Sequence, residues 1–207
     1  MTVYPLYEDF VASVKMKKEK LPFYISIHHV NKTPLHHHDC VELTFVLEGS
    51  GTEIINGTKH LLQTDAASFL LPHHMHEIEC EPGQPVVKYC CMFDINMLLG
   101  SSYESELSSL LFQIGSSIPP FVKFSPAEAE RMRSIMMILH EEYRNPDSVG
   151  RSSLVRVKLT EAMLLFVRAT ESCNTGSIPA DAAEAETKVN FWKVLQYLHV
   201  HYQDKLT

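Results

Sequence analysis

Short runs of alternating hydrophobic and polar residues fill the first half of the chain. Such alternation places successive side chains on opposite faces of a β-strand. The dipeptide Asn56-Gly57 separates two of the runs and strongly favours a two-residue hairpin turn. About seven short strands separated by turns are typical of an antiparallel sandwich or barrel. The predicted strands lie at residues 23–29, 41–48, 52–55, 58–62, 67–71, 76–80 and 86–93.

The periodicity changes to that of amphipathic helices in the second half. The segment Ser125-Pro126-Ala127-Glu128 combines a capping box with proline at the first helical position. We predict one helix from there to Asn145-Pro146 and a second over about residues 152–170. The predicted fold is therefore mainly β with C-terminal α, a β-barrel followed by a helical hairpin. Apolar positions of the first helix are Met132, Ile135, Met136, Leu139 and Tyr143.

Residues 171–187 are small, polar and aperiodic, which is typical of a linker. A third helix is predicted from about Lys188, with an apolar stripe that no later element of the chain covers. We interpret this helix as the start of a truncated further domain. The predicted organisation is a barrel domain over 1–124, a helical hairpin over 125–170, a linker over 171–187 and the truncated domain over 188–207.

Composition narrows the class of protein. Apolar residues make up 45% of the chain and charged residues 21%, as in an ordinary soluble globular protein. No apolar run approaches the roughly 20 residues of a membrane span, and the N-terminal sequence is unlike a signal peptide. The five cysteines include no Cys-x-x-Cys pair, which favours reduced thiols and a cytoplasmic location. A net charge of −7 gives this chain no electrostatic reason to bind DNA by itself.

The most chemically informative segment contains three consecutive histidines. His36, His38 and Glu42 form an H-x-H-x3-E pattern, and they share one face if the strand is continuous or gently bent. His76 is the fourth candidate. Three imidazoles and a carboxylate could hold Zn²⁺, Ni²⁺, Mn²⁺ or Fe²⁺. They could equally bind a polar ligand directly, or form a purely structural network.

Other polar and aromatic residues are candidates for ligand binding. Thr44 shares the face of Glu42 and is expected to bind ligand with it. The only tryptophan is Trp192, in the tail, so aromatic contacts to a sugar would come from residues such as Tyr89. His37 alternates to the opposite face, and the turn residues His73 and His74 are expected at the rim or in solvent.

Two motifs resemble those of the cupin superfamily. The stretch from His36 to Gly49 fits H-x-H-x3-E-x6-G, and the proline-led turn from Pro72 to His76 is similar to the second cupin motif. The resemblance implies a jelly-roll barrel. The position six residues before His36, which is usually glycine, is Val30 here. Such departures favour a binding role over catalysis.

A narrower resemblance covers almost the whole chain. Residues 34–43, 46–57 and 69–77 resemble the N-terminal domain of AraC-type transcriptional regulators, and residues 194–207 resemble the first helix of that family's DNA-binding domain. The resemblance implies that the barrel senses a small molecule, such as a sugar or an organic acid. It implies that the helices form a homodimer and that DNA is bound through a C-terminal domain absent here. We expect the helical hairpin to form the dimer interface, and Met136→Glu to break it.

Two alternatives remain. The first is a metal-dependent cupin enzyme, an oxygenase or isomerase, with His36, His38, Glu42 and His76 as ligands. It lacks an obvious general acid or base beyond those ligands, so no catalytic residue is assigned. The second is a sugar- or acid-binding module without a DNA role, which does not account for the helix predicted near the C-terminus.

Overall fold

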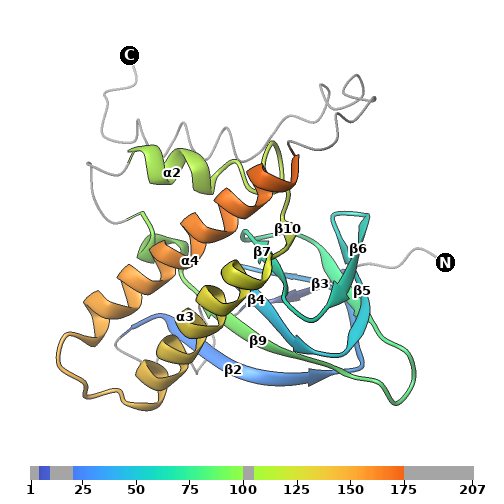
Figure 1. Cartoon of the computed structure of the whole chain (residues 1–207), viewed down its shortest axis with the longest axis horizontal. Helices are drawn as coiled ribbons and strands as arrows, with labels where there is room; N and C mark the ends of the chain where they lie inside the picture. The colour runs from blue at the N-terminus through green and yellow to red at the C-terminus, as the bar shows by residue number, and fades with distance from the viewer. Residues whose placement is uncertain (1–4, 10–20, 100–104, 175–207) are drawn as a thin grey trace.

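The structure is a computed structural model that describes residues 5–9, 21–99 and 105–174 (Figure 1). The predicted tail helix over 188–203 and most of the predicted linker lie outside these residues. Two five-stranded sheets and a layer of helices make up the described part. The expected fold class, an antiparallel jelly-roll barrel followed by helices, is confirmed.

The two sheets face each other and enclose the barrel interior. Neighbouring strands are antiparallel, except that β1 and β3 run parallel. The first sheet has the order β1 (Leu6–Glu8), β3 (Lys32–His38), β8 (His76–Glu79), β5 (Ser50–Ile55), β6 (Thr58–Gln63). The second has the order β10 (Phe121–Lys123), β7 (Ala66–Leu70), β4 (Val41–Glu48), β9 (Val86–Phe93), β2 (Phe23–Val30).

The helices lie together on one side of the β-structure (Figure 1). They are η1 (Ile95–Met97), α2 (Ser105–Leu111), α3 (Pro126–Arg144) and α4 (Arg151–Asn174). The capping box of α3 forms as predicted, because Glu128 accepts hydrogen bonds from the backbone N–H and the hydroxyl of Ser125 at 2.9 and 2.6 Å. α4 continues to Asn174, into the segment predicted to be the linker.

The main hydrophobic core lies between the second sheet and the helices. Leu43 and Phe45 of β4 are fully buried there, and Phe69 of β7 meets Phe166 of α4 with ring centroids 5.6 Å apart. Arg133 of α3 adds a polar tie, since it binds Asp65 at 3.0 Å and lies over the Phe45 ring. The core is therefore continuous across residues 124 and 125, and the division there into two domains stays a prediction.

A second, smaller cluster fills part of the barrel interior. Val46 belongs to it and lies on the same face of β4 as Glu42. Gly49 closes this end of β4 with a φ of 87°, and a Cβ there would lie 2.5 Å from the backbone oxygen of Pro85. The cluster consists of Val30, Val46, Leu62, Ala66, Ile78 and Val86.

The helical hairpin forms, but one residue in it was misplaced. Met136 was expected to lie at the dimer interface, exposed on the single chain, and it is completely buried in the main core. The adjacent Met137 is 50% exposed. The apolar stripe of α3 packs on the second sheet, so Met136→Glu would disrupt folding and cannot test an interface.

Candidate functional site

His38 and Glu42 meet across a turn between two sheets. His38 is the last residue of β3 and Glu42 the second residue of β4, so they do not lie along one strand as predicted. The turn at residues 39–40 reverses the chain between the sheets, and both side chains point into the interior. The Nε2–H of His38 donates to Oε2 of Glu42 at 3.0 Å.

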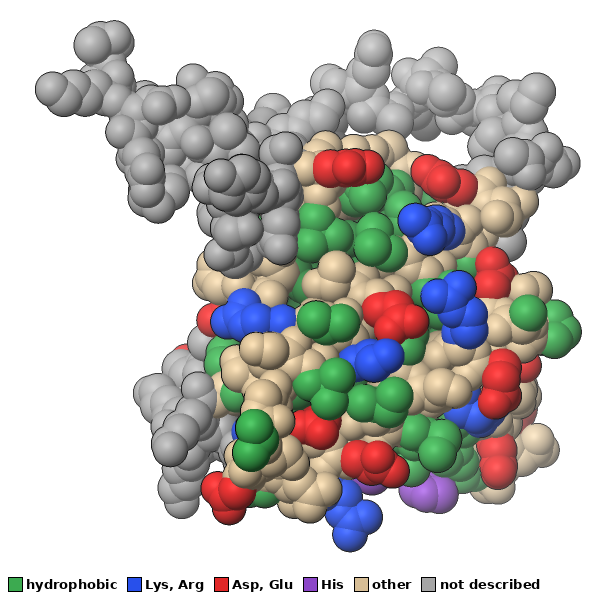
Figure 2. Space-filling model, turned by 60° about the vertical axis from the view of Figure 1, so that its left-hand side comes forward, with side chains coloured by type: hydrophobic (Ala, Val, Ile, Leu, Met, Phe, Trp, Pro, Cys, Tyr) green, Lys and Arg blue, Asp and Glu red, His purple; other side chains and the backbone are tan. Residues whose placement is uncertain are grey.

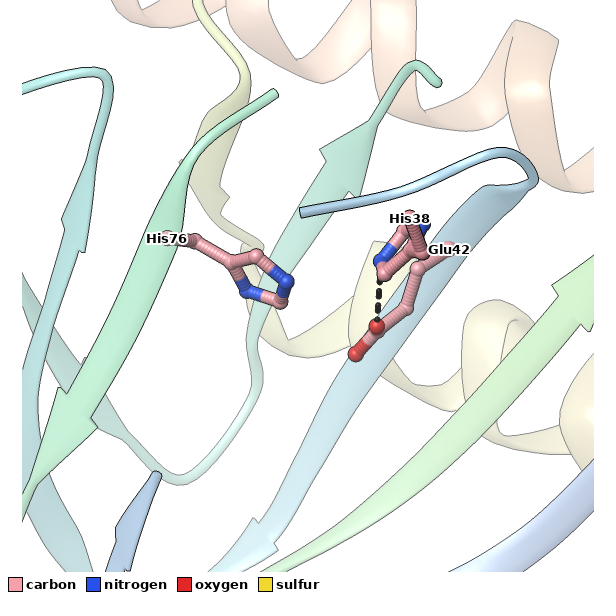
Figure 3. Close-up of side chains that lie close together, drawn as sticks. All are labelled: His38, Glu42 and His76. Carbon is pink, nitrogen blue, oxygen red and sulfur yellow. Dashed lines mark hydrogen bonds and ion pairs between the residues drawn. The ribbon is translucent and has the colours of Figure 1, made fainter. Parts of the chain in front are cut away.

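His76 completes a group of three buried residues. It is the first residue of β8, where it pairs with Ile55 of β5. Figure 3 shows its ring reaching from β8 toward His38 and Glu42. One ligand atom from each of the three lies within 4.8 Å of the others. Three strands from two sheets therefore converge on one small volume.

The negative charge of Glu42 is balanced by neighbouring side chains. Lys88 of β9 is almost fully buried, and its Nζ lies 3.5 Å from Oε1 of Glu42. Burial opposes ionisation of Glu42, but Lys88 and the His38 hydrogen bond hold its pKa well below the usual range. Burial likewise opposes protonation of His38, yet the hydrogen bond to Glu42 raises the His38 pKa. His38 donates its second N–H, Nδ1, to the carbonyl of Cys40 at 3.0 Å.

Glu53 and His76 form a less satisfied pair beside this network. Glu53 of β5 is fully buried, and its Oε1 lies 3.6 Å from Nδ1 of His76. Neither carboxyl oxygen of Glu53 and neither ring nitrogen of His76 has a hydrogen-bond partner among the described residues. Buried polar atoms without partners are uncommon and call for an explanation. Here they mark the part of the interior that is open to a further polar contact.

The remaining predicted positions are spread out. His36 lies beside His76, with ring centroids 4.1 Å apart, but its Nδ1–H donates to the carbonyl of Pro34, and it is outside the group of three. Thr44 faces the interior and shares a 2.6 Å hydrogen bond with Ser68. Tyr89 lies on the other face of the second sheet, where it packs against His140 of α3.

The other histidines take different environments. His37 turns away from the interior, and its ring lies near those of Tyr7 and His73. His74 was expected at the rim or in solvent, and this was wrong, since it is 4% exposed. It is pressed against Gly115, where a Cβ would lie 2.3 Å from the imidazole. Burial lowers the pKa of His74 to about 4, so it is neutral at pH 7.

A cleft of about 540 Å³ lies on the outer face of the first sheet. Glu77 and Ile54 line it, and these residues alternate with the inward-facing His76 and Glu53. None of the predicted site residues lines this cleft. The outer cleft is therefore separate from the interior group.

Comparison with known protein families identifies the domain. Residues 23–159, well over half of the chain, match the family described as the AraC-like ligand binding domain. The chain belongs to this family. The matched region includes β2 to β10, α3 and the start of α4, and with them His38, Glu42 and His76.

Solved structures similar to this AraC-like domain match it at low identity. A cupin protein from Bacteroides fragilis is 24% identical over 41% of this chain and 75% of its own, with a TM-score of 0.35. A polyketide cyclase from Streptomyces resistomycificus is 21% identical over 35% of this chain and 60% of its own, with a TM-score of 0.31. Comparison with curated proteins found no match. Within the described residues, no helix has both the length and the apolar character of a membrane span.

The interior donors of the AraC-like domain fit a divalent metal ion. Two imidazoles and a carboxylate suit Zn²⁺, Ni²⁺, Mn²⁺ or Fe²⁺. The 3.0 Å between Nε2 of His38 and Oε2 of Glu42 is about the separation of two ligands on one ion. The bond from His38 to the Cys40 carbonyl is the kind of outer hydrogen bond that orients metal-binding histidines. His38, Glu42 and His76 are the residues that would hold the ion, which would replace the proton on Nε2 of His38.

Glu53 and Lys88 were missed by the sequence reasoning. Both lie on predicted strands and face the interior, Glu53 two residues from the buried Ile55 and Lys88 two residues from the buried Val86. The signal that could have identified them was a charged residue at an inward-facing position of a predicted strand. A buried lysine is rare unless it is paired, and the pairing with Glu42 is visible only once β4 and β9 lie side by side.

Proposed function

We propose that this AraC-like domain is the ligand-sensing and dimerisation part of a cytoplasmic transcriptional regulator. A small molecule, a sugar or an organic acid, would bind in the barrel interior. The observation that carries the proposal is the buried polar group of His38, Glu42 and His76 inside the region that matches the family. The unpartnered ring nitrogen Nε2 of His76 supplies a contact for such a ligand.

The mechanism would be linkage between the interior and the helices. On β4, Glu42 and Thr44 face the interior, while Leu43 and Phe45 pack in the core shared with α3 and α4. A ligand that binds one arrangement of β4 more tightly than another would shift the population of helix arrangements by its difference in affinity. The helices would in turn position a DNA-binding domain located after residue 207.

Ligand binding can be tested with a panel of sugars and organic acids, by thermal shift and calorimetry. We expect one class to raise the melting temperature of the wild type and to lose most of its affinity in His76→Leu. Glu77→Gln, next to His76 but in the outer cleft, is the matched control and should bind normally. Binding that survives His76→Leu but fails in variants of the outer cleft would move the site there.

The regulatory role needs a separate test. A protein in which this domain is joined to a pair of helix-turn-helix motifs should bind a specific DNA sequence through those motifs. Gel-shift and footprinting experiments with and without the ligand found above would show the dependence. Absence of such motifs would contradict the regulator proposal but leave the ligand-binding proposal standing.

Dimerisation is proposed through the exposed surface of α3 and α4. Figure 2 is turned so that this side of the molecule comes forward, and hydrophobic side chains lie among acidic and basic ones. Met137, Leu154 and Val157 are exposed apolar residues of these helices, at 50%, 38% and 60%. We expect Met137→Glu with Val157→Glu to convert dimers into monomers in sedimentation experiments. Unchanged dimers would place the interface elsewhere.

A metal-dependent cupin enzyme is the second candidate, because three buried side chains that can bind a metal ion converge in the interior. Elemental analysis of protein purified without a metal column tests it first. Stoichiometric metal, together with turnover that disappears in His38→Ala, would favour the enzyme. Metal-free protein with ligand-dependent DNA binding by the natural protein would favour the sensor.

A further inference from the structure

The side chains of Glu53 and His76 are neighbours because of the register between two strands. In the first sheet, β5 pairs with β8 so that Ile55 lies opposite His76 and Glu53 lies opposite Ile78. Glu53 is therefore two residues along β5 from the partner of His76 and shares its face. Both side chains are inside the barrel, with exposures of 0% and 2%. The strand pairing, and not a flexible loop, brings the carboxyl group to the imidazole.

The separation of the pair is just beyond a normal hydrogen bond. Oε1 of Glu53 and Nδ1 of His76 are 3.6 Å apart, where N–H···O bonds have donor–acceptor distances of about 2.7–3.2 Å. A shift of about half an ångström in either side chain would close the bond. A buried carboxyl group with both oxygens unpartnered is costly to keep in a protein interior. Closing the bond to His76 would satisfy one atom of each residue.

His38 shows the arrangement that His76 lacks. Its Nδ1–H is held by the Cys40 carbonyl at 3.0 Å, and its Nε2 consequently points at Glu42. Histidines that bind metal ions usually donate their second ring N–H to a carboxylate or a carbonyl, which fixes both the tautomer and the direction of the ring. Glu53 is in the position to do for His76 what the Cys40 carbonyl does for His38.

We propose that Glu53 is a positioning residue that accepts the Nδ1–H of His76 and thereby directs Nε2 of His76 toward His38 and Glu42. Glu53 does not itself contact the bound group. It keeps His76 in the Nδ1–H tautomer, which leaves the Nε2 lone pair free to bind a divalent cation or to accept a hydrogen bond from a ligand. The inference rests on the proposed binding role of the interior group.

The first experiment measures the tautomer directly and needs no ligand. Ring ¹⁵N shifts of His76 are recorded by NMR in the metal-free protein and in the variants Glu53→Leu, Glu53→Gln and Glu77→Gln. We expect the Nδ1–H tautomer in the wild type and in Glu77→Gln. Glu53→Gln keeps an acceptor oxygen and should keep the tautomer, whereas Glu53→Leu should lose it. An Nε2–H tautomer in the wild type, or one unchanged in Glu53→Leu, would overturn the proposal.

The second experiment measures affinity with Zn²⁺ or Co²⁺ alone, by calorimetry and by the visible spectrum of Co²⁺. Loss of such an outer hydrogen bond lowers metal affinity by about 10- to 100-fold. We expect a loss of that size in Glu53→Leu, a smaller loss in Glu53→Gln and none in Glu77→Gln. Equal affinity in the wild type and in both Glu53 variants would overturn the proposal. If Glu53→Leu fails to fold, Glu53→Gln carries the comparison.

The two proposals can fail separately. If no sugar or organic acid binds but the His76 tautomer depends on Glu53, the ligand-sensing proposal fails and the positioning role stands. If a ligand binds through His76 while the tautomer ignores Glu53, the positioning role fails and ligand sensing stands.

Discussion

The two faces of β4 carry different residues and do different work. Toward the helices, Leu43 and Phe45 are completely buried among apolar side chains. Toward the barrel interior, Glu42 and Thr44 are equally buried, but they meet Lys88, His38 and Ser68. Burial alone therefore does not distinguish the faces. The helix face obtains its stability from packing, whereas the interior face depends on pairing of charges and hydrogen bonds.

The comparison also separates two kinds of interior surface. One part of the barrel interior is filled by a small apolar cluster that includes Val46 and Ile78. The other part holds ionisable groups, some of them without partners. A barrel needed only for support could be apolar throughout, because replacing buried ion pairs by packed apolar residues is often neutral or stabilising. The polar part is thus the region where function is to be expected.

Removing a large side chain from the helix face should have the largest effect on stability. Phe45→Ala is expected to lower the free energy of unfolding by about 3–5 kcal/mol, because it leaves a cavity in the main core. Urea denaturation followed by circular dichroism measures this. The partly exposed Leu47→Ala on the same strand is the control and should cost much less. A loss below about 1 kcal/mol for Phe45→Ala would show that the face is loosely packed.

Breaking the ion pair on the interior face should come next. Lys88→Met leaves Glu42 buried without its ammonium partner and is expected to cost about 3 kcal/mol. The double variant Glu42→Leu with Lys88→Met should recover most of that loss, since neither charge then remains. Denaturation of the two variants side by side checks this. If the double variant does not recover stability, Glu42 and Lys88 stabilise the fold by more than neutralising each other's buried charge.

His74 is a buried polar residue that lies on neither face of β4, so it extends the comparison to a third environment. Its pKa of about 4 lies below the value near 6.5 of an unfolded histidine, so the unfolded state binds more protons between these values. Its contribution to stability is complete above about pH 6.5 and is lost as the pH falls toward 4. From pH 7 to pH 4.5 we expect a loss of about 2 kcal/mol that is absent in His74→Gln. Parallel pH dependences of the two proteins would contradict the burial of the neutral ring.

The smallest effect is expected from the neutral hydrogen bonds of the Thr44 hydroxyl, which also accepts from the backbone N–H of Ser68 at 3.3 Å. Thr44→Val keeps the shape of the side chain but leaves the Ser68 hydroxyl without its 2.6 Å partner. We expect a loss of about 1 kcal/mol in the free energy of unfolding. Thr44→Val with Ser68→Ala should lose less than the sum of the two single variants. Additive losses would show that the two hydroxyls do not act together.

The sequence predicted best where one residue pattern determines one local structure. The alternation in residues 41–48 correctly assigned Leu43 and Phe45 to one face and Glu42 and Thr44 to the other. The capping box correctly placed the start of α3. The three-residue strands β1 and β10 and the short helix α2 were missed, because such short elements show no measurable period.

The structure brings together some of the residues that the sequence named for the interior and places others elsewhere. His38, Glu42 and His76 were named, and the structure brings them together. On β9, an aromatic residue was expected inside, but Lys88 faces the interior and Tyr89 faces the helices. Single-strand reasoning places lysine in solvent, since its charge is costly to bury. Only the pairing of β4 with β9 brings in the Glu42 carboxylate, which offsets the cost of burying Lys88.

The contacts of Arg133 with Asp65 and Phe45 tie α3 to two parts of the barrel, and this has a mechanical consequence. Arg133 joins α3 to Asp65 in the turn between β6 and β7, and its guanidinium lies over Phe45 of β4. β4, which borders the interior, thus also packs against α3, and the ion pair between Arg133 and Asp65 fixes the helix to the neighbouring turn. Because β4 borders both the barrel interior and the core under α3, it cannot move on one side alone. Any displacement of β4 by an occupant of the interior is a displacement of the surface on which α3 rests, with no intervening loop to absorb it.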